Sequence, residues 1–112
     1  MDITFKDRKI ENYANNDRLA VRKLGKLRAN NLKQRLDDLR AASTLEDTRY
    51  LPGRFHELKG DRKGQWSCDL DHPYRLVFEP HEDPIPTNKD GQYLWVEILG
   101  VEIIEIVNYH KS

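Results

Sequence analysis

Five side chains of the sequence are of the types needed to cleave an RNA phosphodiester without a metal ion. That reaction needs a base for the 2′-hydroxyl proton, cations around the phosphorane and an acid for the departing 5′-oxygen. The residues that supply such groups are His56, Lys59, Arg75, Tyr109 and His110. Because any chain with four histidines offers similar groups, the elements that carry these residues must decide whether they meet.

Turn signals and alternation predict the elements around these residues. Leu51–Gly53 contains a proline–glycine turn, and Phe55–Leu58 has room only for a brief strand. Gln65–Leu70 alternates polar and apolar residues, which predicts a half-buried strand. Tyr74–Glu79 is predicted as the next strand. It follows a turn at Asp71–Pro73, so these last two strands should pair as an antiparallel hairpin.

The loop between the first two of these strands is basic. His56 precedes the loop and Trp66 follows it, and the cations beside and within it are candidate RNA-binding residues: Arg54, Arg62 and Lys63. Such a turn is a plausible phosphate site. The alternative is an ordinary hairpin whose charged loop is simply solvated.

Alternation also assigns side chains to the two faces of the predicted sheet. Cys68 shares the apolar face with Trp66, which favours a buried structural thiol over a nucleophile. If that face looks toward the helices, Ser67 and Arg75 look out over the open face.

The N-terminal part of the chain is predicted to be helical after a first strand at Asp2–Phe5. A short helix is expected to run to Tyr13, and Asn15–Asn16–Asp17 is a break with good N-cap residues for the next one. Apolar residues at three- and four-residue steps predict a helix over Asp17–Ala42. Gly25 and the pair Asn30–Asn31 weaken its middle, so one bent helix and two helices both stay open, as do a solvated and a partner-facing role for its basic face.

The C-terminal part begins with a polar, proline-rich loop at Pro80–Gln92. Tyr93–Gly100 is predicted as a strand or strand-like lead-in, and Val101–Val107 suits a central strand because it is apolar on nearly both faces. Helices collected at the N-terminus and strands after them indicate an α+β fold.

Composition excludes several classes of protein. The chain of 112 residues is 38% hydrophobic and 34% charged, which fits one polar but foldable domain. One cysteine excludes an internal disulfide, and no apolar run is long enough to span a bilayer, so we expect a cytoplasmic protein without a membrane partner.

Residues 1–63 hold 16 of the 19 Lys and Arg but 10 of the 19 Asp and Glu. Since that half is basic, it could meet a phosphate backbone although the whole chain is neutral.

The stretch 51–67 resembles the signature of the HigB-type toxins of the RelE/ParE superfamily, also called plasmid maintenance system killer proteins. The matching residues are Leu51–Pro52–Gly53, His56, Leu58–Lys59–Gly60–Asp61–Arg62–Lys63–Gly64 and Trp66–Ser67. Tyr74–Phe78 is similar to the family's next strand and Tyr109–His110 to its terminal motif. The resemblance implies a RelE-like α+β fold. In that fold an N-terminal strand and helices pack on an antiparallel-dominated sheet of about four to five strands, within a single domain over residues 1–112.

The resemblance also implies an activity and partners. It implies the toxin of a type II toxin–antitoxin system, a ribosome-dependent endoribonuclease that cuts mRNA on the 70S ribosome without a metal or other cofactor. A helix-turn-helix, HigA-like antitoxin would neutralise it. The implied catalytic residues are His56, Lys59, Tyr109 and His110, with Arg75 added from its strand. One histidine would accept the proton, Lys59 and Arg75 would stabilise phosphate charge, and Tyr109 would orient or stack on a base.

One position departs from the family pattern. Asn108 stands where the terminal motif usually has an acid, and an amide cannot act as a base. Two alternatives therefore stay open: a toxin of the same fold that acts on another target such as DNA gyrase, and an inactive paralogue that only binds an antitoxin.

Overall fold

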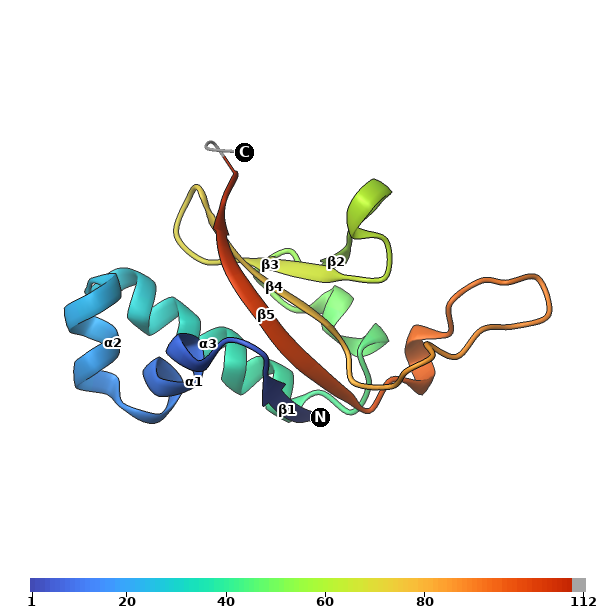
Figure 1. Ribbon diagram of the computed structural model, residues 1–112, viewed down its shortest axis with the longest axis horizontal. Helices are drawn as coiled ribbons and strands as arrows, with labels where there is room; N and C mark the ends of the chain where they lie inside the picture. The colour runs from blue at the N-terminus through green and yellow to red at the C-terminus, as the bar shows by residue number, and fades with distance from the viewer. Residues whose placement is uncertain (110–112) are drawn as a thin grey trace.

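The computed structural model describes residues 1–109. Within these residues, five strands and three α-helices, with three short 3₁₀ helices, follow one another (Figure 1). Their bounds are β1 Asp2–Phe5, α1 Arg8–Asn15, α2 Asp17–Leu24, α3 Lys26–Ala41, η1 Glu46–Tyr50, β2 His56–Glu57, η2 Gly60–Arg62, β3 Trp66–Asp69, β4 Tyr74–Pro80, η3 Trp95–Glu97 and β5 Gly100–Asn108.

The strands form one sheet in the order β1-β5-β4-β3-β2. β1 and β5 run parallel, and every other pair of neighbours is antiparallel. The apolar segment predicted as a central strand is β5, the long red strand of Figure 1, and it lies between β1 and β4. The α+β class and the antiparallel-dominated sheet are thus confirmed.

The predicted helix over Asp17–Ala42 is two helices. Gly25 separates α2 from α3 with a φ of 85°, a left-handed backbone conformation that glycine adopts at little cost. Asn16 caps α2 as predicted, since its side chain accepts a hydrogen bond from the backbone N–H of Leu19.

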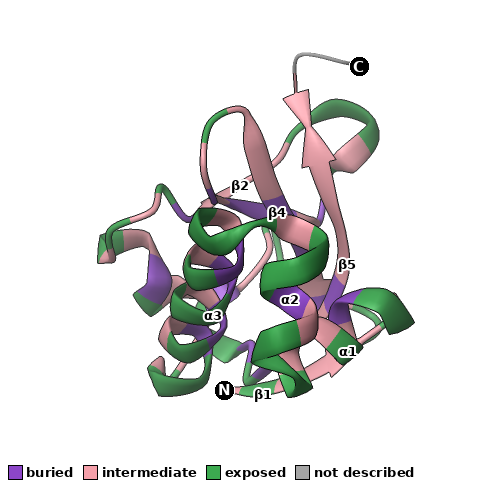
Figure 2. Cartoon of the chain, turned by 90° about the vertical axis from the view of Figure 1, so that its left-hand side faces the viewer, coloured by how far each residue is buried: buried purple, intermediate pink, exposed green. Residues whose placement is uncertain are grey.

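The core lies between the helices and one face of the sheet. Leu32, Leu36 and Leu39 of α3 are almost fully buried and belong to one apolar cluster with Trp66 and Phe78 of the sheet. The outer surfaces of α2 and α3 are exposed (Figure 2). The face predicted to look toward the helices is therefore the one that they cover.

The prediction of a strand over Tyr93–Gly100 is wrong for most of that segment. Residues 95–97 form η3, and Tyr93 makes only an isolated bridge with Thr87. The reason is packing. Trp95 meets Trp66 edge-on, with ring centroids 5.5 Å apart, and its indole N–H donates to Glu57 at 3.1 Å. Trp95 therefore packs into the core cluster, and the backbone around it forms a 3₁₀ helix instead of a strand.

Candidate active site

The register of the sheet gathers polar residues on its open face. His56 of β2 lies opposite Ser67 of β3, and Asp69, two residues further along β3, lies opposite Arg75 of β4. Since side chains two residues apart share a face, all four project from the same side of the sheet. The core side chains of β3, Trp66 and Cys68, project from the other side.

Asp69 links the arginines of this face. Its carboxylate lies 3.5 Å from Nε of Arg75 and 3.8 Å from a terminal nitrogen of Arg54. The Arg75 guanidinium in turn lies 4.2 Å from the centroid of the Tyr109 ring, a cation–π contact. We call Arg54, His56, Asp69, Arg75 and Tyr109 the open-face cluster.

The main chain before β2 sets the state of the His56 ring. Nδ1 of His56 lies 2.7 Å from the carbonyl oxygen of Arg54. Because a carbonyl only accepts hydrogen bonds, Nδ1 carries the proton in this pair, and the neutral ring keeps its lone pair on Nε2. Arg54 has a φ of 52°, in the left-handed region that non-glycine residues rarely adopt. The sharp corner at Gly53–Arg54 thus presents this carbonyl to the histidine.

The basic residues of the loop go to three different places. Lys59 is exposed and lies beyond the end of β2, directly before η2. Arg62 is paired, donating to Glu105 of β5 at 2.6 Å and to Gln65 at 2.9 Å. The Lys63 ammonium lies over the ring of Tyr93, 5.6 Å from its centroid.

Of the predicted RNA-binding cations, only Arg54 therefore lies within the open-face cluster. Lys63 lines a separate hollow between η2 and the segment after β4, together with several acidic side chains, Asp61, Glu79, Glu82, Asp83 and Glu102. Arg62 donates to Glu105, which lies opposite Val77 on the same face of the sheet as the cluster. Arg62 is therefore on the open face but outside the cluster.

Two neighbours in β3, Ser67 and Cys68, lie on opposite faces of the sheet, and both are buried. Ser67 is on the open face yet fully buried, and its hydroxyl has no hydrogen-bond partner among residues 1–109. Cys68 is also fully buried, and burial raises the pKa of its thiol far above the usual range. The predicted structural role of Cys68 is confirmed by this burial.

The C-terminal motif is described only in part. Tyr109 belongs to the open-face cluster, whereas His110 lies outside the described residues. Asn108 lies opposite Tyr74, on the helix-facing side of the sheet, while Arg75 lies opposite Val107 on the open face. A side chain at position 108, acidic or not, therefore projects away from the cluster.

Asp69 is the member of the cluster that the sequence analysis missed. The alternation of β3 already placed it on the same face as Ser67, and its partner in the predicted hairpin is Arg75. A carboxylate facing an arginine across two strands was the available signal. What the sequence did not show is that Arg54, from a different turn, reaches the same carboxylate.

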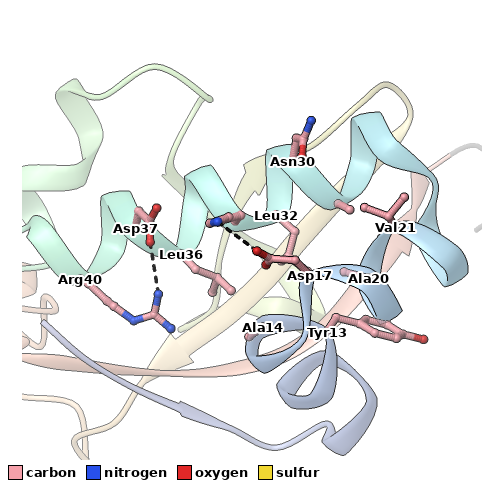
Figure 3. A pocket seen from close by; sticks show the side chains of 12 residues that line it. Tyr13, Ala14, Asp17, Ala20, Val21, Asn30, Leu32, Leu36, Asp37 and Arg40 are labelled. Atoms are coloured by element: carbon pink, nitrogen blue, oxygen red, sulfur yellow. Dashed lines mark hydrogen bonds and ion pairs between the residues drawn. The ribbon is translucent and has the colours of Figure 1, made fainter.

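Other features of the described chain lie apart from this cluster. A hollow between the helices is lined by residues such as Tyr13, Val21 and Leu36, and the ion pairs Asp17–Lys33 and Asp37–Arg40 stand at its edge (Figure 3). Within residues 1–109 there is no group of three or more His, Cys, Asp or Glu placed to bind a metal ion. None of the helices in this part of the chain has the length and apolar character needed to cross a bilayer.

The arrangement of helices and sheet is that of a known class of toxin. A solved structure of the YoeB–YefM complex from Staphylococcus aureus contains a chain that superposes with a TM-score of 0.57 at 17% identity. The match covers 95% of this chain and 93% of that one. The fold is therefore the one that RelE- and YoeB-like toxins share.

Sequence comparisons identify the family within that class. Residues 3–89 match the HigB-like toxin family, described as the RelE-like toxin of type II toxin–antitoxin system HigB. Toxin HigB-1 of Vibrio cholerae is 35% identical over 80 residues, which are 70% of this chain and 83% of that protein. The chain belongs to the HigB-like family of type II toxin–antitoxin toxins. The family match begins in β1, well before the stretch that carried the resemblance, and ends within the proline-rich loop.

Proposed function

We propose that this toxin is a ribosome-dependent endoribonuclease that cuts mRNA without a metal ion. The observation that carries the proposal is the open-face cluster, in which a histidine whose Nδ1 lies 2.7 Å from the Arg54 carbonyl oxygen shares one face of the sheet with two arginines. A base and cations on one surface are what attack by a 2′-hydroxyl requires.

The proposed reaction is an internal displacement at phosphorus. The 2′-oxygen of the RNA forms a bond to phosphorus while the bond from phosphorus to the 5′-oxygen breaks. One group accepts the proton of the 2′-hydroxyl, and another donates a proton to the departing 5′-oxygen. The products are a 2′,3′-cyclic phosphate on one fragment and a 5′-hydroxyl on the other, so no oxidant, cofactor or water is consumed.

His56 is the proton acceptor that the geometry favours. The Arg54 carbonyl fixes the proton on Nδ1, which leaves Nε2 as the basic atom of the ring. The sequence alone leaves this role open between His56 and His110. The family resemblance names His110 as catalytic, and in the reaction proposed here it serves as the acid.

Arg75 and Lys59 stabilise the charge that develops on the phosphate. Arg75 is held from two sides, by Asp69 and by the Tyr109 ring, so its guanidinium is already oriented before RNA arrives. Lys59 is exposed at the entrance to η2 and adds a point charge from the loop. Arg54 extends the cationic surface along the RNA backbone.

The partners follow from the same proposal. The mRNA is presented by the 70S ribosome in its decoding site, and a helix-turn-helix, HigA-like antitoxin neutralises the toxin. The solved relative from Staphylococcus aureus is itself a complex, of YoeB with YefM, which supports an antitoxin partner for this chain. All of these partners are cytoplasmic.

The test is cleavage of mRNA on programmed 70S ribosomes, with fragment ends mapped by primer extension. The wild-type toxin and a His81→Ala control are expected to cut, because His81 is an exposed histidine outside the open-face cluster. His56→Ala is expected to lose cleavage by at least about a hundredfold, the usual contribution of a general base.

Two results would overturn the proposal. One is unchanged cleavage by His56→Ala. The other is growth arrest by the wild-type toxin without any transcript cleavage, which would favour a different target such as DNA gyrase. Copurification with an antitoxin but no growth effect would indicate an inactive paralogue.

A further inference from the structure

Arg28 and Asp71 form a partly buried ion pair between α3 and the turn that joins β3 to β4. Nε and one terminal nitrogen of Arg28 donate to the two carboxylate oxygens of Asp71 at 2.9 and 3.0 Å. The side chains keep only 22% and 18% of their exposed surface. A two-pronged pair with this little solvent fixes orientation as well as distance, unlike an ordinary surface ion pair.

The same arginine also makes a cation–π contact with Tyr74, the first residue of β4. The Arg28 guanidinium lies 3.4 Å from the centroid of the Tyr74 ring, so it contacts both ends of the turn at residues 71–74. The turn is closed by its own hydrogen bond from the Tyr74 N–H to the Asp71 carbonyl at 2.7 Å. One helix side chain is therefore bonded to both ends of this turn.

The turn at 71–74 is hydrogen-bonded to the residue that follows β5. The backbone N–H of Tyr109 donates to the carbonyl oxygen of Pro73, in the middle of the turn, at 3.2 Å. In Figure 1 the turn lies beside the point where β5 ends, which is where this bond is made. The ring of Tyr109 then lies beneath Arg75 in the open-face cluster.

We propose that Arg28 and Asp71 are positioning residues for the active site. They fix the turn at 71–74, and the Pro73 carbonyl of that turn fixes Tyr109 under Arg75. Neither residue belongs to the open-face cluster, and both act through other groups. Their role in cleavage rests on the function proposed above, whereas their effect on Tyr109 does not.

The test compares backbone order in the free toxin by ¹⁵N relaxation. Asp71→Asn removes the charge of the acceptor, and Arg28→Lys keeps a cation but loses the planar fork. The matched control is Arg49→Lys. Arg49 also donates to carboxylates, of Glu46 and Glu57, and also lies over an aromatic ring, at 4.6 Å from that of Trp66, but it makes no contact with the turn.

We expect the order parameter of the Tyr109 amide to fall from a rigid value to below about 0.6 in both Asp71→Asn and Arg28→Lys. It should stay at the wild-type value in Arg49→Lys, and the amide of Ile103 in the middle of β5 should not change in any variant. An unchanged Tyr109 amide in both variants would overturn the proposal. So would a parallel loss of order at Ile103, because that result indicates general loosening.

A kinetic arm separates this proposal from the proposed function. On programmed ribosomes, Asp71→Asn is expected to lower the cleavage rate about tenfold at saturating ribosomes, with little change in the concentration for half-maximal rate, because the reacting groups are misplaced. A full cleavage rate with a disordered Tyr109 would contradict the positioning role. If the wild-type toxin cuts no RNA, the proposed function fails while the relaxation result still decides the link from the turn to Tyr109.

Discussion

The two faces of the sheet are made from alternate residues of the same strands, and they differ most in charge, although Ser67 and Val77 of the open face are as buried as the core. On the helix-covered face, Trp66, Cys68 and Phe78 are completely buried in one apolar cluster. On the open face, Asp69 and Arg75 keep a quarter to a third of their side-chain surface and meet through charge. The difference assigns stability to one face and, in the function proposed above, RNA cleavage to the other, and substitutions on each face can test this division.

The largest loss of stability is expected from Trp66→Ala. The side chain is fully buried, packs edge-on against Trp95 and has the Arg49 guanidinium over its ring. Removing it leaves a cavity in the core and should cost about 3–5 kcal/mol of unfolding free energy. Urea denaturation followed by circular dichroism measures this loss, and a cost below about 1 kcal/mol would break the division between the faces.

A smaller loss is expected from Asp71→Asn, which leaves the core intact. The Arg28 guanidinium holds the pKa of the Asp71 carboxyl below its usual value of 3.8. The stabilisation from the pair is therefore fully present above about pH 4 and disappears as the pH falls through the lowered pKa. At pH 7 the variant should lose about 1.5–3 kcal/mol, the range for a hydrogen bond to a charged group.

Denaturation of Asp71→Asn and wild type from pH 7 down to pH 2 checks the sign of this effect. The stability difference between them should shrink with acidity, since the wild-type carboxylate becomes protonated. A difference that stays constant over this range would show that the charge of Asp71 does not stabilise the fold.

Gly53→Ala tests the contact between the turn before β2 and Arg35 of α3. Gly53 has a φ of 107°, and an added Cβ would lie 2.6 Å from the guanidinium of Arg35, whose Nε donates to the Asp69 carbonyl at 2.8 Å. Backbone strain and the displaced arginine should together cost about 1–3 kcal/mol. Gly64→Ala is the comparison, because its φ of 95° brings similar strain while an added Cβ would meet only side-chain ends, Cδ1 of Ile85 at 3.3 Å and the Tyr93 hydroxyl at 3.9 Å. Equal losses in the two variants, measured by urea denaturation, would show that contact with Arg35 adds nothing.

The smallest effect is expected from Ser67→Ala. The hydroxyl is buried without a hydrogen-bond partner among residues 1–109, so removing it should leave stability unchanged or raise it by up to about 1 kcal/mol. Thermal unfolding measures this change. A clear loss of stability would mean that the hydroxyl is satisfied in solution, and the contrast between Ser67 and its neighbour Cys68 would be weaker than the structure indicates.

The sequence predicted the faces of the sheet well because the signal is local. Strict alternation over Gln65–Leu70 has only one arrangement that buries Trp66 and Cys68, and it places Arg75 on the other face once the hairpin pairs. The low helix propensity of glycine, which is also a local signal, placed a break at Gly25 among the possibilities. The helical periodicity did not choose between a bend and two helices, because the left-handed conformation of Gly25, with its φ of 85°, is a property of the folded chain.

The features that were missed depend on residues far apart in the chain. The strand predicted over Tyr93–Gly100 is replaced by η3 because Trp95 contacts Trp66 and Glu57, and no local pattern contains those contacts. The contact of Asp69 with Arg54 was missed for the same reason, because Arg54 comes from a separate turn, whereas the pairing of Asp69 with Arg75 was available from the predicted hairpin. The family resemblance named the candidate residues of the site, but only the register of the sheet shows which of them meet.

The chemistry of the RNA ends tests the central claim most directly. Fragments produced by the wild-type toxin on programmed 70S ribosomes should carry a 2′,3′-cyclic phosphate and a 5′-hydroxyl, in the presence of EDTA concentrations that leave the ribosome intact. Both products should be absent with His56→Ala, whose unfolding free energy should stay within about 1 kcal/mol of wild type. Fragments with 5′-phosphate ends, or the same fragments from His56→Ala, would contradict an open face that cleaves RNA through this histidine.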